Sequence, residues 1–154
     1  MPPLSTTPAG NQAQGFGRTL LEFTVDASGT QEDLQLRRMQ FEFQFPENST
    51  LQIQNIHLED ENGVTVSTGI GGGGGPGFSS IAFSLNEQYV FSGSPRRYRL
   101  KADVLLGPGD IQGRSPLNAS ISEGGTLWSY DDVPETYAFD RYQFRRLDGP
   151  WQIY

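Results

Sequence analysis

Two short acidic clusters hold the side chains best suited to binding a metal ion. Asp60 and Glu61 lie in one polar run, and Asp131 and Asp132 form a second pair. Calcium is bound in proteins by carboxylate and carbonyl oxygens. Neither cluster has the spacing of a helix–loop–helix calcium loop, so calcium is possible at either, with a solvated turn as the alternative. No other metal or cofactor is expected.

Residues for nucleophilic or acid–base catalysis form no recognisable pattern. His57 is the single histidine, and the chain contains no cysteine. No serine lies in a sharp strand–turn–helix motif that would expose it as a nucleophile. We therefore predict that the chain is not an enzyme. The lack of cysteine also excludes disulfides and thiolate metal sites.

Several residues could carry or bind sugars. Asn48 and Asn118 each begin an Asn-X-Ser/Thr sequence, and Thr6 and Thr7 precede a proline as in O-glycosylated stretches. Aromatic side chains crowd the C-terminal part and could stack on sugar rings, although such residues also fill cores and subunit interfaces. These aromatic residues are Trp128, Tyr130, Tyr137, Tyr142, Trp151 and Tyr154.

The charge balance narrows the range of partners. The net charge is −7 and the isoelectric point is about 4.6. Nucleic acid is excluded as an expected partner because phosphate binding needs a basic surface. No apolar run is long enough to span a membrane. Ten of the eleven basic residues are arginine, which suits planar contacts at protein interfaces.

Alternation of apolar and polar residues dominates the chain after residue 18. It is clearest at Leu21–Val25 and Tyr98–Val104, and turn residues separate the alternating runs. The apolar phase changes at Arg37-Arg38 and near Asn55, which indicates bulges, and Glu59–Gly63 reads as a hairpin turn. We predict an all-β fold over residues 19–154, a two-sheet antiparallel sandwich of jelly-roll or immunoglobulin-like type with nine or ten strands.

The first eighteen residues differ from the rest of the chain. They contain no charged side chain before Arg18, and Leu4 and Phe16 are their large apolar anchors. Such a segment cannot bury enough surface to order itself. We expect residues 1–18 to form an extended N-terminal arm that another surface holds, and a neighbouring subunit is the preferred holder over the body of the same domain.

Five segments between about residues 19 and 132 carry a family likeness. They are FTVDASG at Phe23–Gly29, MQFEFQF at Met39–Phe45, LEDENG at Leu58–Gly63, YRLKADV at Tyr98–Val104 and the pair Trp128-Ser129. Together they resemble secreted β-sandwich domains of bacterial surface proteins. This resemblance implies export, a cell-surface or extracellular location and no catalytic activity.

The arm adds a resemblance to filament subunits that assemble by strand exchange, in which a terminal segment completes the sheet of the next subunit. This second resemblance implies a non-enzymatic, pilus-like subunit of a head-to-tail homopolymer. Either terminus could be the donor, and a carbohydrate-binding or adhesive module is the alternative function. The expected interface residues are Leu4, Phe16, Arg37, Arg38, Arg97, Arg99, Trp151 and Ile153.

Overall fold

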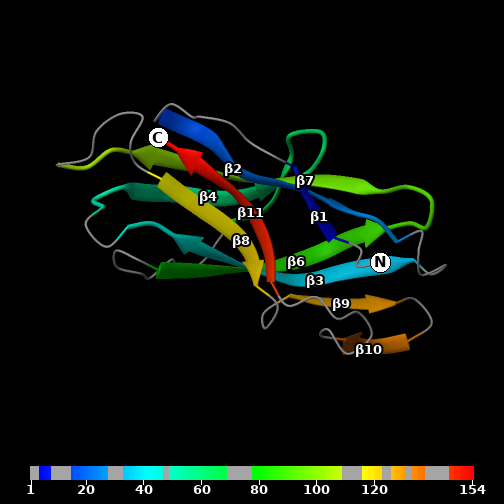
Figure 1. Cartoon of the computed structure of the whole chain (residues 1–154). Helices are drawn as coiled ribbons and strands as arrows, with labels where there is room; N and C mark the ends of the chain where they lie inside the picture. Colours follow the sequence, from blue (N-terminus) through cyan, green and yellow to red (C-terminus); the bar gives the residue numbers. More distant parts are fainter. Residues whose placement is uncertain are drawn as a thin grey trace.

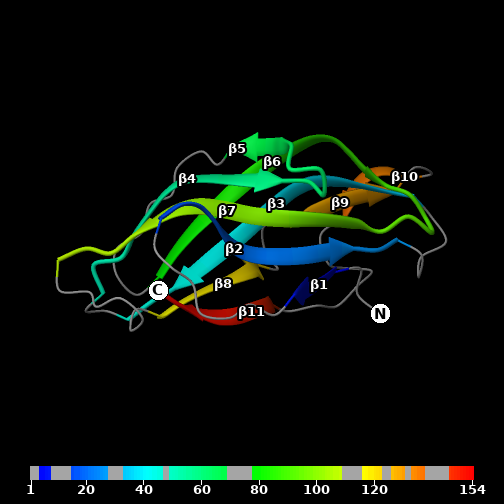
Figure 2. The same ribbon diagram turned by 90° about the horizontal axis from the view of Figure 1, so that it is seen from above.

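A computed structural model shows two antiparallel β-sheets packed face to face (Figures 1 and 2). It describes residues 4–7, 15–27, 33–46, 49–68, 78–108, 116–122, 126–130, 133–137 and 146–154. These residues form eleven strands. The all-β, two-sheet antiparallel sandwich expected from the alternation is confirmed. Within the described ranges, no helix is long and apolar enough to cross a membrane.

The first sheet contains five strands. Its order is β1-β2-β7-β4-β5, and all of its neighbouring strands run antiparallel. β7 lies at its centre and pairs with β2 on one side and β4 on the other. The strands are β1 (Leu4–Thr7), β2 (Gly15–Val25), β7 (Arg96–Leu105), β4 (Gln52–Glu59) and β5 (Thr65–Thr68).

The second sheet is built around β3 (Leu34–Gln44). β6 (Phe78–Val90) pairs with its whole length on one side. The other side is shared, because β9 (Leu127–Tyr130) pairs with the first half of β3 and β8 (Pro116–Ser122) with the second half. Two outer strands complete the sheet: β10 (Val133–Tyr137) beside β9 and β11 (Arg146–Ile153) beside β8.

An aromatic cluster forms the centre of the core between the sheets. Phe41 of β3 lies 5.8 Å from Phe23 of β2 and 5.6 Å from Phe83 of β6, measured between ring centroids. Tyr98 of β7 stacks on Phe23 at 5.6 Å. All four residues are buried because the period-two alternation points them inward from both sheets.

The changes of phase in the sequence correspond to irregular pairing, as predicted. The register of β3 shifts between Leu36 and Arg38, and that of β4 shifts between Gln54 and His57. Asn55 lies in the left-handed region with φ 52°. The hairpin turn before β5 is also confirmed, since the Gly63 N–H donates to the Asp60 carbonyl.

Two strands run further than the turn residues suggest. β6 is one continuous strand that includes Glu87, although Glu87 is in the left-handed region with φ 55°. β11 continues through Gly149-Pro150, where its register shifts. A Cβ on Gly149 would lie 2.4 Å from the Ala119 carbonyl oxygen, so only glycine fits this close approach.

The described part of the N-terminal arm lies on its own sheet. Leu4–Thr7 pairs with Val25–Glu22 of β2, and β2 itself begins at Gly15, inside the segment expected to be the arm. The preference for a neighbouring subunit as the holder of the arm is therefore corrected for these four residues. Their backbone groups are satisfied by the edge of β2, which would otherwise carry no strand.

Candidate functional site

On the side of the sandwich away from β1, two strand edges have no pairing partner among the described strands. The first part of β4, residues Gln52–Ile56, pairs with β7, but β5 reaches only His57–Glu59 on the other side. β6 pairs with β3, and no described strand pairs with its opposite edge. Both edges therefore present backbone N–H and C=O groups that another extended segment could bond.

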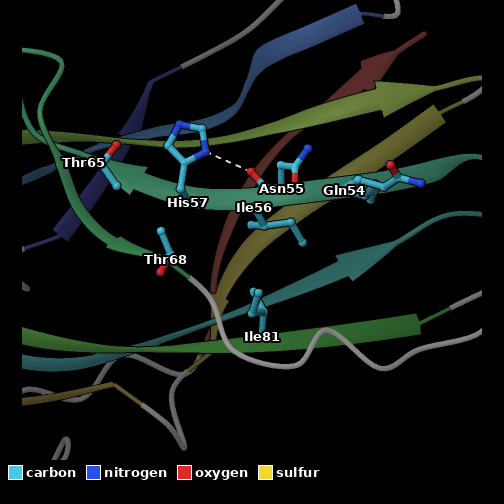
Figure 3. Close-up of a pocket in the computed structure, with 8 residues that line it drawn as sticks. Gln54, Asn55, Ile56, His57, Thr65, Thr68 and Ile81 are labelled. Atoms are coloured by element: carbon cyan, nitrogen blue, oxygen red, sulfur yellow. Dashed lines mark hydrogen bonds between the residues drawn. The ribbon is translucent and has the colours of Figure 1, made fainter.

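A groove of about 560 Å³ lies between these two edges, here called the β4/β6 groove (Figure 3). Its apolar part comes from half-buried Ile53 and Ile56 of β4 and from Ile81 of β6, which is 4% exposed. Figure 3 shows Ile56 and Ile81 on facing sides of the space. The groove is lined by Ile53, Gln54, Asn55, Ile56, His57, Thr65, Thr68 and Ile81, none of them acidic, lysine or arginine.

Asn55 shapes the rim of the β4/β6 groove. Its side-chain amide donates to Asp103 on β7 at 2.5 Å, and the N–H of Gly17 donates to the same carboxylate at 2.9 Å. The hydrogen bond from Asn55, followed by that from Gly17, lowers the pKa of Asp103. These bonds fix the left-handed backbone at Asn55, so the irregular edge of β4 is a built feature.

His57 continues the rim with both ring nitrogens engaged. Nδ1 lies 2.9 Å from the Asn55 carbonyl oxygen (Figure 3), and Nε2 lies 3.1 Å from Oε1 of Glu59. Lys101 Nζ is 3.5 Å from the same carboxylate. The ring is thus held in a polar row beside the groove, and the groove offers backbone hydrogen bonding and apolar contact as its main chemistry.

A second polar cluster joins the two sheets beyond the end of β4. Arg96 of β7 lies 3.2 Å from Glu61 and 3.5 Å from Asp60, and its guanidinium sits 5.2 Å above the Tyr98 ring. Gln88 of β6 accepts hydrogen bonds from Arg96 and from the Tyr98 hydroxyl. These contacts hold the β4–β5 turn and β7 against β6, so the cluster stabilises the fold.

Ionisation of Tyr98 is expected to lower the stability of the fold at alkaline pH. Burial raises the pKa of its hydroxyl from 10.0 to about 12. Between these pH values the unfolded chain loses the proton while the folded chain keeps it, so ionisation favours unfolding. We expect the unfolding free energy to fall by about 3 kcal/mol across this range because of this group. In urea titrations across this range, Tyr98→Phe should lose less stability than the natural chain; an equal loss would contradict this assignment.

The calcium candidates that the structure describes already serve the hairpin turn. Asp60 Oδ1 accepts the N–H groups of Asn62 and Val64, and Glu61 pairs with Arg96. Within the described ranges, no group of three acidic, histidine or cysteine side chains is placed to hold a metal ion. The first cluster is therefore better explained as a turn. Asp131 and Asp132 lie outside the described residues.

The arginines expected at an interface do not form one patch. Arg97 and Arg99 of β7 lie on the first sheet, where their Nε atoms are 3.3 and 3.6 Å from Glu22 of the same chain. Exposed Arg37 and Arg38 belong to β3 in the second sheet, and Arg37 donates to the Ser129 hydroxyl. A contact with acidic loops of another copy would have to use the two sheets separately.

The apolar interface candidates also separate. Phe16 is 78% exposed on β2, so it is available for a contact. The backbone of Leu4 lies in β1, whereas its side chain is outside the description. Trp151 and Ile153 belong to β11 and pair with β8, and the final Tyr154 is fully buried. The C-terminal segment is therefore built into its own sandwich, which argues against its use as the donor.

Of the candidate glycosylation sites, Asn118 is the one whose side chain the structure describes. Asn118 is 3% exposed and its amide donates to the Gly149 carbonyl at 2.6 Å, so the folded chain has no room for a glycan there. Asn48 lies outside the described residues, as do the side chains of Thr6 and Thr7.

The C-terminal aromatics offer no described sugar platform. Trp128 is 1% exposed and Tyr154 is fully buried, and both belong to the core. The side chains of Tyr130, Tyr137 and Trp151, and all of Tyr142, lie outside the description. An exposed pair that the alternation did not single out is Tyr89 and Phe91, stacked with ring centroids 6.4 Å apart and 14° between planes.

No protein-family model matches the chain, and no curated protein matches it either. Among solved structures, the third cohesin of ScaC from Acetivibrio cellulolyticus, bound to the ScaB dockerin, aligns with a TM-score of 0.54 at 13% identity. The alignment covers 97% of each chain. A chain from a complex of a CaDoc0917 variant with CaCohA2 aligns with a TM-score of 0.52 at 9% identity, covering 97% of this chain and 96% of that one.

A third structure is more distant. The CssB subunit of enterotoxigenic Escherichia coli colonization factor CS6, complemented with a donor strand from CssA, aligns over 97% of this chain and 95% of that one. Its identity is 11% and its TM-score is 0.37, which is too low to indicate a shared fold. The first two alignments show the fold, and the expected resemblance to bacterial β-sandwich domains is confirmed at that level.

Proposed function

We propose that the chain is a non-enzymatic structural subunit of an extracellular filament or surface assembly. Each copy adds an extended terminal segment to the sheet of the next copy. The observation that carries this proposal is the β4/β6 groove, where two open strand edges flank an apolar floor. The extracellular location is supported by the likeness of the strand motifs to secreted bacterial sandwiches.

An extended segment suits this groove better than a small molecule does. The open edges offer rows of backbone donors and acceptors, which a β-strand complements along its length. The five residues Gln52–Ile56 span about 16 Å, the length of a short strand. Alternate side chains of such a strand would reach the isoleucine floor, and burying that floor contributes roughly 25 cal/mol per Å² of apolar surface.

The proposed contact joins two different surfaces of the molecule. A terminal segment of one copy enters the β4/β6 groove of the next, so every copy keeps one free donor and one free acceptor. A heterologous contact of this kind continues without closing unless its rotation forms a ring. The expected product is an open fibre or an extended surface array.

Blocking the groove tests this proposal. The chain has no cysteine, so Gln54→Cys can be labelled uniquely with a maleimide that carries polyethylene glycol. Gln54 is exposed and lines the groove, whereas Val64 is 57% exposed on the hairpin turn outside it. We expect the labelled Gln54→Cys chain to sediment as a monomer under conditions in which the labelled Val64→Cys control assembles. Equal assembly of both labelled chains would overturn the role of the groove.

A carbohydrate-binding or adhesive module is the second candidate function. Tyr89 and Phe91 favour it, because planar exposed rings can stack on sugars. Their segment is held by the Ser92 N–H bonded to Asp33 and by the Ser94 N–H bonded to the Phe91 carbonyl. Dispersed single copies that bind glycans would favour this candidate over the structural subunit.

A further inference from the structure

We propose that the segment entering the β4/β6 groove is Leu4–Thr7 of a second copy. We further propose that the pairing of the same segment with its own β2 holds the chain in an unassembled state. This inference rests on the proposed function. It names the donor segment and the contact that keeps this segment from being donated. β1 would then have two alternative acceptors, the edge of β2 in its own chain and the groove of a neighbour.

The position of β1 allows such an exchange. It is the outermost strand of the first sheet and covers only Glu22–Val25 of the eleven-residue β2. Seven residues separate it from the start of β2. Its four residues fit within the open part of β4, the five residues Gln52–Ile56.

The chemistry of donor and groove also agrees. Among the described residues, the groove lining includes no acidic, lysine or arginine side chain, and the chain before Arg18 carries no charged side chain. A charged segment would lose hydration in this groove without gaining a partner. The C-terminal segment is a poorer donor than β1, because β11 pairs with β8 along its length, Ile153 opposite Pro116, and Tyr154 is buried in the core.

The exchange is balanced in backbone hydrogen bonding. The edge of β1 that bonds to β2 would bond to the groove instead, so the two arrangements exclude each other and form similar numbers of backbone bonds. What differs is the cover over the half-buried side chains of Ile53 and Ile56, which the neighbour's segment would bury further. The balance therefore depends on protein concentration, since only the arrangement between copies is bimolecular.

A reversible disulfide between β1 and β2 tests whether their pairing prevents assembly. Ser5 and Thr24 lie opposite each other in the antiparallel pair, where the Cα separation suits a disulfide. The Ser5→Cys, Thr24→Cys double variant should form an intrachain disulfide when oxidised and remain monomeric in sedimentation. Adding reductant should restore assembly to the level of the two single variants. Unimpaired assembly of the oxidised, intrachain-linked chain would overturn the inference.

A second cysteine pair tests the acceptor. In assembled material, Ser5→Cys combined with Gln54→Cys should give a ladder of disulfide-linked chains on a non-reducing gel. If the Ser5→Cys, Thr24→Cys pair gives the ladder instead, β1 swaps onto the β2 of a neighbour, and the groove assignment is wrong. If the labelled Gln54→Cys chain fails to assemble while the intrachain lock has no effect, the proposed function stands and this inference falls.

Discussion

Removing Met1–Thr7 is expected to abolish assembly and leave a folded monomer. The truncation deletes β1 but preserves β2, which begins at Gly15 and supplies buried Leu20 and Leu21 to the core. The unfolding free energy should fall by no more than about 2 kcal/mol, because each backbone hydrogen bond is worth about 1 kcal/mol net and chain entropy offsets part of it. Sedimentation and circular dichroism measure the two effects separately.

A shorter truncation is the matched control. Deleting Met1–Pro3 leaves all of β1 in place, so this chain should still assemble. Polymers formed by the chain that lacks Met1–Thr7 would contradict the proposed donor. Removal of all eighteen residues would be a poorer test, because it also cuts away the first part of β2, including the pairing of Arg18 with Ala102.

Phe41→Ala is expected to be the most damaging single substitution in the core, with a loss of about 3–5 kcal/mol in unfolding free energy. Phe41 is fully buried on the central strand of its sheet and contacts Phe23 across the core and Phe83 on the neighbouring strand β6. Its removal would leave a cavity that β3 cannot close, because β6 and β8 pair with it on both sides at this position. Urea denaturation should show a lowered midpoint with little change in slope.

An exposed phenylalanine provides the control for that prediction. Phe91 is 56% exposed, so Phe91→Ala should change the unfolding free energy by about 0.5 kcal/mol or less. A similar loss for Phe41→Ala and Phe91→Ala would show that the aromatic cluster between the sheets is not the centre of the core.

The fold class could be predicted from the sequence because apolar and polar residues alternate along a half-buried strand. The bulges were equally visible, since Leu36 and Met39 can face the same core only if an extra residue lies between them. A strand that is buried on both faces does not show this alternation of apolar and polar residues. β8 is an example, where Asn118 and Ser120 are as buried as the apolar residues that alternate with them.

The candidate site was far harder to predict. Ile53 and Ile56 are visible in the sequence as strand residues, and the phase change at Asn55 was the one local sign of the groove. Whether their edge is open depends on the order of strands, because the described part of β5, Thr65–Thr68, pairs with the end of β4 alone. The placement of β1 beside β2 is likewise a long-range pairing between two backbones, which side-chain patterns do not encode.

Electron microscopy of the concentrated, unmodified chain tests the central claim most directly. Strand addition between the groove of one copy and the amino-terminal strand of the next predicts regular fibres or arrays with one repeating contact. Single dispersed particles at every concentration, from a chain shown to be folded, would contradict the claim.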